Sequence, residues 1–201
     1  MKKVFALLAL LALILCGCTA QAAPEMYIEP AQLSEEEEAV AKLLGADTDQ
    51  HLFDVVLDET AKKVTVNTYV LADGEWELVT GGGGMALKEG VKQGRMAFGF
   101  EDLRGECREA LQFGKDFTAV KYGPPEEPDD PEGMGRTTSL LANRTEIAYE
   151  REIPIAIQIN TTKNEVHSYD PESFFEPERY AELGYEHVYA LTMTFSQEPL
   201  S

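Results

Sequence analysis

Cysteine is scarce in this chain of 201 residues, which contains only three. Cys16 and Cys18 lie near the N-terminus, so Cys107 is the only cysteine in the rest of the sequence. A single cysteine cannot form an internal disulfide, and the fold must therefore depend on its apolar core. Cys107 lies in a strand-like run, residues 106–113, on the face shared by Leu111. We expect a buried structural thiol, because nothing near it in the sequence would activate a nucleophile.

Basic residues are also few: 17 Lys and Arg stand against 36 Asp and Glu, which gives a net charge of −19. Binding to phosphate backbones needs clustered Lys and Arg, so nucleic acid is disfavoured as a partner. Attraction to anionic lipid headgroups is disfavoured for the same reason. An acidic surface promotes solubility and mutual repulsion between molecules.

Long apolar runs are absent beyond the N-terminus. The run Val4–Leu15 has 12 residues and follows Lys2 and Lys3. A transmembrane helix needs about 20 apolar residues, so this run is too short to span a bilayer comfortably. A short basic region followed by such a run is typical of a signal peptide.

The residues at the end of this run, Leu15-Cys16-Gly17-Cys18, resemble the lipobox of bacterial lipoproteins. The resemblance implies that residues 1–17 are a lipoprotein signal peptide and that Cys18 becomes the lipidated first residue. Acyl chains such as palmitate would then anchor the protein on the outer side of the cell membrane. Cys16 does not fit, because the bulky Leu15 precedes it. The alternative is an ordinary secretory signal with two incidental cysteines.

Removal of residues 1–17 would leave 184 residues with 36 acidic and 15 basic side chains, a net charge of −21. Residues 18–33 are small, polar and proline-containing at their start, which predicts a flexible tether. Residues 34–198 are long enough for a single domain with its own core. The mature chain looks like the small uncharacterised lipoproteins of gut Gram-positive bacteria, a similarity that implies no particular activity.

One helix is predicted at the start of the domain. Ser34 is a suitable N-cap, Glu37 stands at the capping-box position, and four consecutive glutamates complement the positive end of the helix. Val40, Leu43 and Leu44 form its apolar stripe, before Gly45 ends it.

From residue 51 onward apolar residues alternate with polar ones, a period typical of strands. The alternation and the turn at Asp73-Gly74 predict a hairpin over residues 63–80. A second hairpin is predicted from residues 106–113 and 117–122. Two further strands follow, one with Ile153, Ile155, Ile157 and Ile159 on a single face, the other with Tyr185, His187, Tyr189, Leu191, Met193 and Phe195.

Eight to ten such strands predict a mainly β fold, an antiparallel β-sandwich with a closed barrel as the alternative. Short helical turns are expected near residues 171–183. Pro154 should lie on an edge strand or at a bulge, because it cannot donate a ladder hydrogen bond.

Two segments invite a ligand-binding interpretation that simpler explanations outweigh. Residues 81–84 are four glycines, but no Gly-Lys-Ser/Thr enters a helix as in a phosphate-binding loop, so we expect a strand connection or bulge. Residues 123–135 contain Asp129, Asp130 and Glu132, which are weak candidates for Ca²⁺ ligands. Prolines restrict their convergence, and we expect a mobile acidic loop with no metal and no cofactor.

Catalytic signatures are lacking. His51, His167 and His187 show no metal-ligand spacing, and Ser139 and Ser168 have no Gly-x-Ser-x-Gly context.

Aromatic residues offer a different possibility, a surface on which sugars or peptides could stack, although burial is the default for the tryptophan. The candidates for this surface are Trp76, Tyr122, Tyr149, Tyr169 and Tyr189. In a separate pair, Phe174 and Phe175, we expect one ring to fill an end of the sandwich and the other to be exposed.

The sequence therefore predicts a lipid-anchored extracytoplasmic module that binds or interacts, with a protein, glycan or peptide as the unidentified partner. A hydrolase acting on envelope or other polymers is the first alternative. A transport-associated solute-binding lipoprotein is the second, although the chain lacks the alternating βα pattern of two-lobed receptors.

Overall fold

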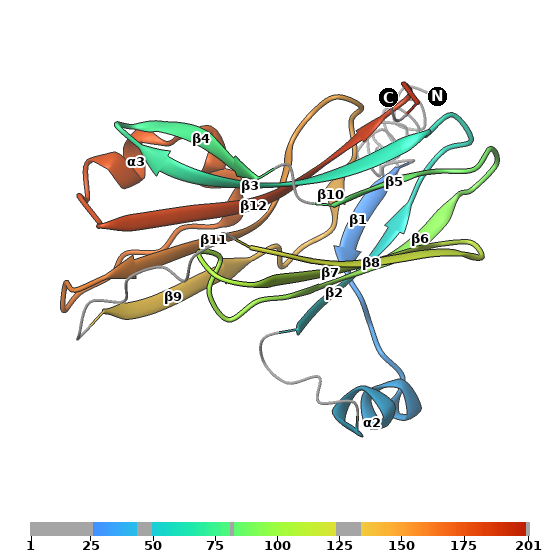
Figure 1. Cartoon of the computed structure of the whole chain (residues 1–201), viewed down its shortest axis with the longest axis horizontal. Coiled ribbons are helices and arrows are strands. Elements are labelled where there is room, and N and C mark those ends of the chain that lie inside the picture. The colour runs from blue at the N-terminus through green and yellow to red at the C-terminus, as the bar shows by residue number, and fades with distance from the viewer. Residues whose placement is uncertain (1–25, 44–49, 81–82, 124–133, 200–201) are drawn as a thin grey trace, which may run out of the picture.

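The computed structural model describes residues 26–43, 50–80, 83–123 and 134–199. These ranges contain twelve strands, most of them with alternating apolar and polar residues, and two short α-helices. The strands form two antiparallel sheets that lie as two layers (Figure 1), and neither closes into a barrel. The mainly β two-sheet prediction is confirmed. No helix in the described ranges is long and apolar enough to cross a bilayer.

The first sheet has the order β10-β1-β2-β6-β7-β8. Its strands are β1 (Tyr27–Pro30), β2 (Gln50–Val56), β6 (Gln93–Gly99), β7 (Cys107–Phe113), β8 (Asp116–Tyr122) and β10 (Thr145–Glu146).

The second sheet has the order β4-β3-β12-β11-β9, with β5 also paired to β3. Its strands are β3 (Lys63–Ala72), β4 (Glu75–Thr80), β5 (Gly84–Ala86), β9 (Gly135–Leu140), β11 (Ile153–Thr161) and β12 (His187–Ser196).

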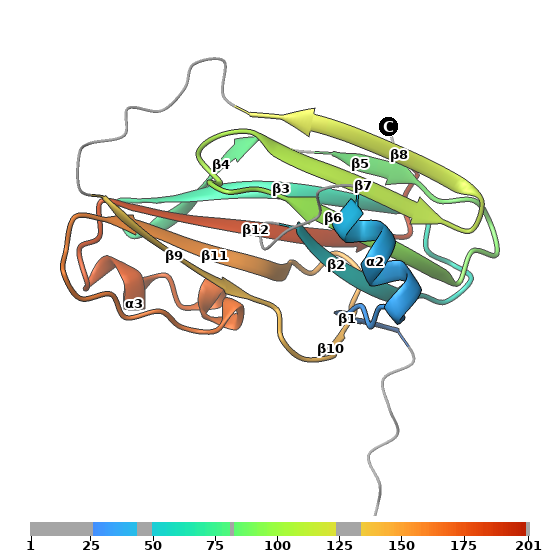
Figure 2. The ribbon, with the colours of Figure 1, turned by 90° about the horizontal axis from the view of Figure 1, so that it is seen from below.

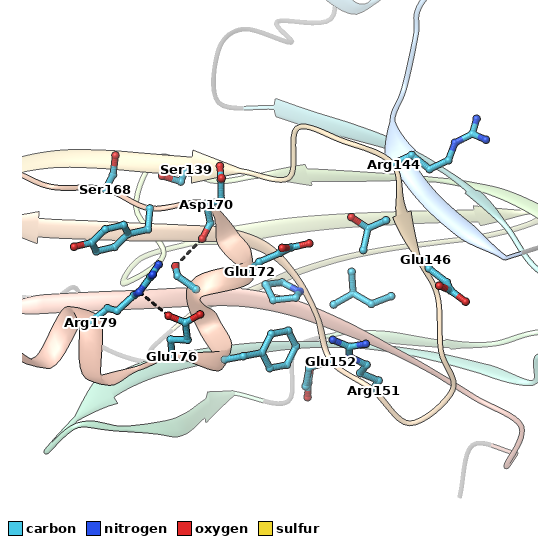
Figure 3. A pocket seen from close by; sticks show the side chains of 16 residues that line it. Ser139, Arg144, Glu146, Arg151, Glu152, Ser168, Asp170, Glu172, Glu176 and Arg179 are labelled. Atoms are coloured by element: carbon cyan, nitrogen blue, oxygen red, sulfur yellow. Dashed lines mark hydrogen bonds and ion pairs between the residues drawn. The ribbon is translucent and has the colours of Figure 1, made fainter. Parts of the chain in front are cut away.

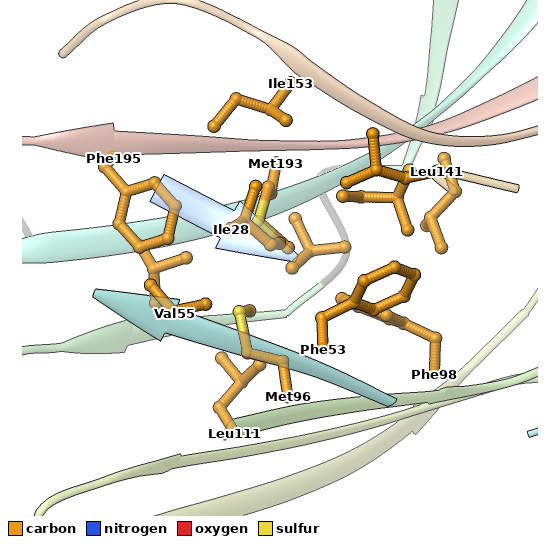
Figure 4. Close-up of a cluster of buried hydrophobic side chains, with 14 of the residues drawn as sticks. Ile28, Phe53, Val55, Met96, Phe98, Leu111, Leu141, Ile153, Met193 and Phe195 are labelled. Carbon is orange, nitrogen blue, oxygen red and sulfur yellow. The ribbon is translucent and has the colours of Figure 1, made fainter. Parts of the chain in front are cut away.

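The main core lies between the two sheets (Figure 4). Full burial of each large apolar side chain contributes about 1.5–3 kcal/mol, so this cluster supplies most of the stabilisation. Its fully buried members include Ile28, Met96, Leu111, Ile155, Met193 and Phe195.

Both predicted hairpins are present. β3 and β4 are joined by Asp73 and Gly74, which both have the positive φ that a tight hairpin turn requires. β7 and β8 are joined through Gly114, whose φ is also positive.

A β-bulge at Pro154 redirects β11. The pairing with β12 shifts between Pro154 and Ala156, which confirms the prediction of an edge or bulge position. The expectation that four isoleucines share one face is wrong for the same reason. Ile153 and Ile155 join the main core, whereas Ile157 and Ile159 point to the other side of the sheet.

A second apolar cluster covers the outer face of the second sheet. The 3₁₀-helix η1 (Pro171–Phe175) and helix α3 (Glu178–Ala181) supply Phe174 and Tyr180 to it, in the region where helical turns were predicted. Tyr185 also packs here, although it was expected to share the face of Phe195. Phe174 thus covers a sheet face and does not fill an end of the sandwich.

Helix α2 (Glu35–Leu43) begins as predicted, with Ser34 N–H donating to Glu37 at 2.8 Å and Glu37 N–H donating to the Ser34 hydroxyl at 3.3 Å. Its apolar side chains Val40 and Leu43 are exposed, so the predicted stripe does not pack on the domain. Leu44 and Gly45 lie outside the described residues. Figure 2 shows α2 and α3 toward opposite ends of the molecule.

The folded domain includes residues that were predicted as tether. β1 pairs with both β2 and β10, although residues 27–30 fall inside the predicted range 18–33. Ile28 is fully buried in the core, which explains why this short segment is held in the sheet. Cys18 and the predicted signal peptide lie outside the described residues.

Candidate functional site

A cleft of about 860 Å³ opens where β10 of the first sheet comes near β11 of the second (Figure 3). Its lining comes from Ser139 on β9, residues 144–146 around β10, residues 151–154 at the start of β11, and the segment 168–179 that contains η1 and α3. We call it the η1 cleft. Its volume lies in the range of small-molecule sites.

The backbone at the rim of the η1 cleft takes an uncommon conformation. Glu150 has a φ of 59°, which non-glycine residues rarely adopt, and its N–H donates to Phe195 O at 2.9 Å. Arg151 and Glu152 follow directly and line the cleft. Backbone of this kind persists where the surroundings fix it, and it clusters at ligand sites.

The opposite wall is fixed to the second sheet. The Trp76 indole N–H donates to Phe174 O at 2.7 Å, and the two rings stack with centroids 5.2 Å apart. Inside the wall, the Ser173 and Tyr180 hydroxyls share a 2.6 Å hydrogen bond. Phe175 is 47% exposed and faces the cleft, whereas Phe174 is 8% exposed. The expectation of one buried and one exposed phenylalanine is confirmed.

Glu152 is the most firmly held carboxylate of the cleft. Its Oε1 accepts hydrogen bonds from Asn67 Nδ2 at 3.2 Å and Tyr69 OH at 2.8 Å. Its Oε2 accepts one from Thr192 Oγ1 at 2.5 Å. Burial, followed by the hydrogen bond to this carboxylate, raises the pKa of Tyr69 to about 12. Glu152 is therefore preorganised as a negative charge on the floor of the site.

Two of the three cleft arginines already have carboxylate partners. Arg144 donates to both oxygens of Glu29, at 2.8 and 3.0 Å. Arg179 pairs with Glu176 at 2.5 Å and lies over the Tyr169 ring.

Arg151 differs from the other two arginines. Its guanidinium lies over the Phe175 ring, 5.2 Å from the centroid, and it forms no ion pair within the part of the chain that the structure describes. Glu146 and Glu172 likewise have no hydrogen-bond or ion-pair partner among the described side chains. The cleft therefore offers both an available cation and available anions.

The histidines of the chain do not line the η1 cleft. A pocket holding His167 or His187 with carboxylates would have favoured hydrolysis, but neither histidine lines it. His167 lies 3.6 Å from Glu165, and His187 lies beside Tyr189. Among the described residues no three His, Cys, Asp or Glu side chains are grouped as metal ligands.

The predicted aromatic surface is only partly assembled. Of the five candidates, Tyr169 lines the η1 cleft, and Trp76 packs in the second apolar cluster. Tyr122, Tyr149 and Tyr189 pack against the main core. The five rings do not form one stacking surface.

The glycine-rich segment connects two strands on the same edge of β3, as expected for a strand connection. β4 pairs with the C-terminal half of β3, and β5 pairs with residues 63–65. Lys88 forms an ion pair with Asp116 at 2.5 Å. Gly81 and Gly82 lie outside the described residues, as do the Ca²⁺ candidates Asp129, Asp130 and Glu132.

Cys107 is buried, as predicted. Burial, with smaller contributions from the charges of Asp102 and Glu106, raises the pKa of its thiol to about 12. A thiol with this pKa is not a nucleophile at neutral pH.

A second hollow of about 310 Å³ lies on the outer face of the first sheet. Ala97, Ala110 and Ala119 are paired across β6, β7 and β8 and form its floor. The basic side chains beside it, Arg108 and Lys121, are both paired with Glu106. It offers fewer available polar groups than the η1 cleft.

Sequence reasoning did not identify Arg151, Glu146 or Glu172 as site residues, because no motif marks them and distant segments bring them together. Comparisons with protein families, with curated proteins and with solved structures found no match to this chain.

Proposed function

We propose that this protein is a lipid-anchored extracytoplasmic binding protein whose ligand site is the η1 cleft. Cys18 attaches the mature chain to the membrane, and the two-sheet domain presents the cleft to ligands near that surface. The sequence Leu15-Cys16-Gly17-Cys18 supports the anchor. The observation that carries the binding role is the cleft itself, which has a preorganised Glu152 and available charges of both signs.

The anchor is tested with Cys18→Ser in the full chain, expressed in a bacterial host and labelled with an alkyne analogue of palmitate. Cys16→Ser is the matched control. We expect label and membrane attachment in the wild type and in the control, and neither in Cys18→Ser. Labelling that persists in Cys18→Ser would contradict the anchor.

The binding role is tested by thermal unfolding of the full chain in detergent, with a panel of amino acids, short peptides, monosaccharides and organic anions. A ligand at 100 times its Kd stabilises the folded state by about 2.7 kcal/mol, which gives a clear rise in Tm. We expect at least one compound to raise the Tm of the wild type but not that of Arg151→Glu. Arg108→Glu, on the outer face of the first sheet, is the control and should respond like the wild type.

Two results would contradict the binding role of the cleft. One is that no compound of the panel raises the Tm of the wild type. The other is that every active compound raises the Tm of Arg151→Glu equally.

A further inference from the structure

The available charges of the η1 cleft define what it can bind. Arg179 is neutralised by Glu176 within the cleft, and Arg144 by Glu29 just outside it. Among the described residues that line the cleft, Arg151 is the cation that remains for a ligand. A guanidinium presents a planar set of N–H donors that matches a carboxylate in a bidentate geometry.

Phe175 prepares Arg151 for this role. The guanidinium lies over the ring, so one of its faces is shielded while its N–H groups lie at the edge. The positive φ of Glu150 fixes the backbone immediately before Arg151. Both features limit the freedom that the side chain would lose when it binds a carboxylate.

The available anions lie on other elements of the cleft. Glu172 belongs to η1 and Glu146 to β10, and in the view of Figure 3 Arg151 lies below both, with Glu172 to its left and Glu146 to its right. Glu152 already accepts three hydrogen bonds, so it has less capacity left for a ligand. An ammonium group is therefore best placed at Glu146 or at Glu172, which lie on different elements.

Other ligand classes fit the cleft less well. A neutral sugar stacks on open aromatic faces, but Phe175 and Tyr169 each carry a guanidinium over the ring. A ligand with only negative charge would meet Glu146, Asp170 and Glu172 as well as Arg151. Since charges of both signs are available, the cleft is complementary to a ligand that carries both.

We infer that the η1 cleft binds a zwitterionic ligand of the amino-acid or short-peptide class, with its carboxylate on Arg151 and its ammonium group at Glu146 or Glu172. This inference rests on the proposed function, because it assigns the ligand class of the same cleft. A cleft of about 860 Å³ has room for a short peptide as well as for a single amino acid.

The test uses isothermal titration of the full chain in detergent with four probes. These are trialanine with free ends, its N-acetyl form, its C-terminal amide, and the form blocked at both ends. We expect free trialanine to bind most tightly and each single block to weaken the Kd at least tenfold. A tenfold change corresponds to about 1.4 kcal/mol, close to the lower end of charge-assisted hydrogen bonds.

Cleft variants assign the two ends of the probe. Arg151→Gln should weaken free trialanine at least tenfold and leave the affinity for the C-terminal amide unchanged, because the amide has no carboxylate to lose. The double variant Glu146→Gln/Glu172→Gln should weaken the free peptide but not its N-acetyl form. Arg108→Gln is the matched control and should change neither affinity.

The inference is overturned if the amide or the N-acetyl form binds as tightly as the free peptide. It is also overturned if none of the four probes binds while another compound of the panel raises the Tm in an Arg151-dependent manner. In that second case the proposed function stands with a different ligand class. If no compound of any class depends on Arg151, both proposals fail.

Discussion

Glu109 on β7 reaches across the interior of the sandwich and accepts a hydrogen bond at 3.1 Å from the N–H of Gly83, the residue just before β5 of the opposite sheet. Its side chain is 2% exposed, and its Oε1 has no hydrogen-bond partner among the residues that the structure describes. The buried hydroxyls of Thr68 and Tyr122 lie in the same region and likewise have no hydrogen-bond partner within the described ranges. Burial raises the pKa of Glu109 to about 7, against a slight opposing effect of the Gly83 hydrogen bond.

The pKa of Glu109 predicts that stability falls as the pH rises. In the unfolded chain a glutamate titrates near 4.3, so between about pH 4.5 and 7 the folded state binds more protons than the unfolded state. The stabilising contribution of the proton is complete below pH 4 and is lost as the pH rises through 7. One pKa unit corresponds to 1.36 kcal/mol, so Glu109 accounts for a loss of about 4 kcal/mol by pH 8.

This loss is measured as the difference in the free energy of unfolding between the wild type and Glu109→Gln from pH 4.5 to 8. The glutamine keeps the shape of the protonated acid and does not titrate, so subtraction isolates the carboxyl group. Glu75→Gln, in the exposed hairpin, is the control and should show no such difference. Parallel curves for the wild type and Glu109→Gln would contradict the raised pKa.

Gly83→Ala tests the close approach between the sheets. An added Cβ would lie 2.3 Å from both carboxylate oxygens of Glu109, so either the Glu109 side chain or the backbone at residue 83 must move. Overpacking of this kind costs about 1–3 kcal/mol, measured by denaturant unfolding. The cost should fall in a Glu109→Ala background, where the space is free.

The control for this prediction is Gly135→Ala. Its added Cβ would lie 3.7 Å from the nearest atom, Thr161 O, which is an ordinary contact. A Gly83→Ala cost that is the same with and without the Glu109 side chain would show that the contact is not its cause.

The fold was more predictable than the site. The hairpins at Asp73-Gly74 and Gly114 depend on neighbouring residues, and local alternation revealed their strands. The faces of β11 were predicted wrongly because the bulge at Pro154 changes the side on which later residues lie. The sequence shows where the proline is, but it does not show how the partner strand is registered against it.

The η1 cleft could not be read from the sequence. Arg151 becomes available because the neighbouring carboxylates are paired with other groups. Glu29 pairs with Arg144 and Glu152 with Tyr69 across distant segments of the chain, whereas Glu176 pairs with Arg179 three residues away. The signal that was present is Phe174-Phe175 between acids and prolines, which did predict one exposed ring. It did not show that Arg151 lies over that ring.

Phe174→Ala should destabilise the domain much more than Phe175→Ala, although the residues are adjacent. Phe174 is buried against Trp76 and Tyr69, so its loss leaves a cavity that costs about 3–5 kcal/mol. Phe175 is largely exposed, and its loss should change the free energy of unfolding by less than about 1 kcal/mol.

Trp76 is the only tryptophan, so its fluorescence reports directly on this contact. We expect a red shift of its emission in Phe174→Ala, because water gains access to the indole, and no shift in Phe175→Ala. Equal stability losses or equal emission shifts in the two variants would show that η1 does not pack on Trp76 as described.

Cys107 should be unreactive until the domain unfolds. Its pKa of about 12 leaves about one thiolate in ten thousand at pH 8, and burial blocks the approach of a reagent to the remainder. If Cys18 is lipidated and residues 1–17 are removed, Cys107 is the only free thiol of the mature chain. Titration with a chromogenic disulfide should therefore detect no thiol in the native protein and one per chain in denaturant.

The control is Ser168→Cys, which places an exposed thiol at the rim of the η1 cleft and should react promptly without denaturant. Rapid reaction of Cys107 in the native wild type would mean that the interior near β7 and β8 opens readily, and the buried environment assigned to Glu109 would then fail with it.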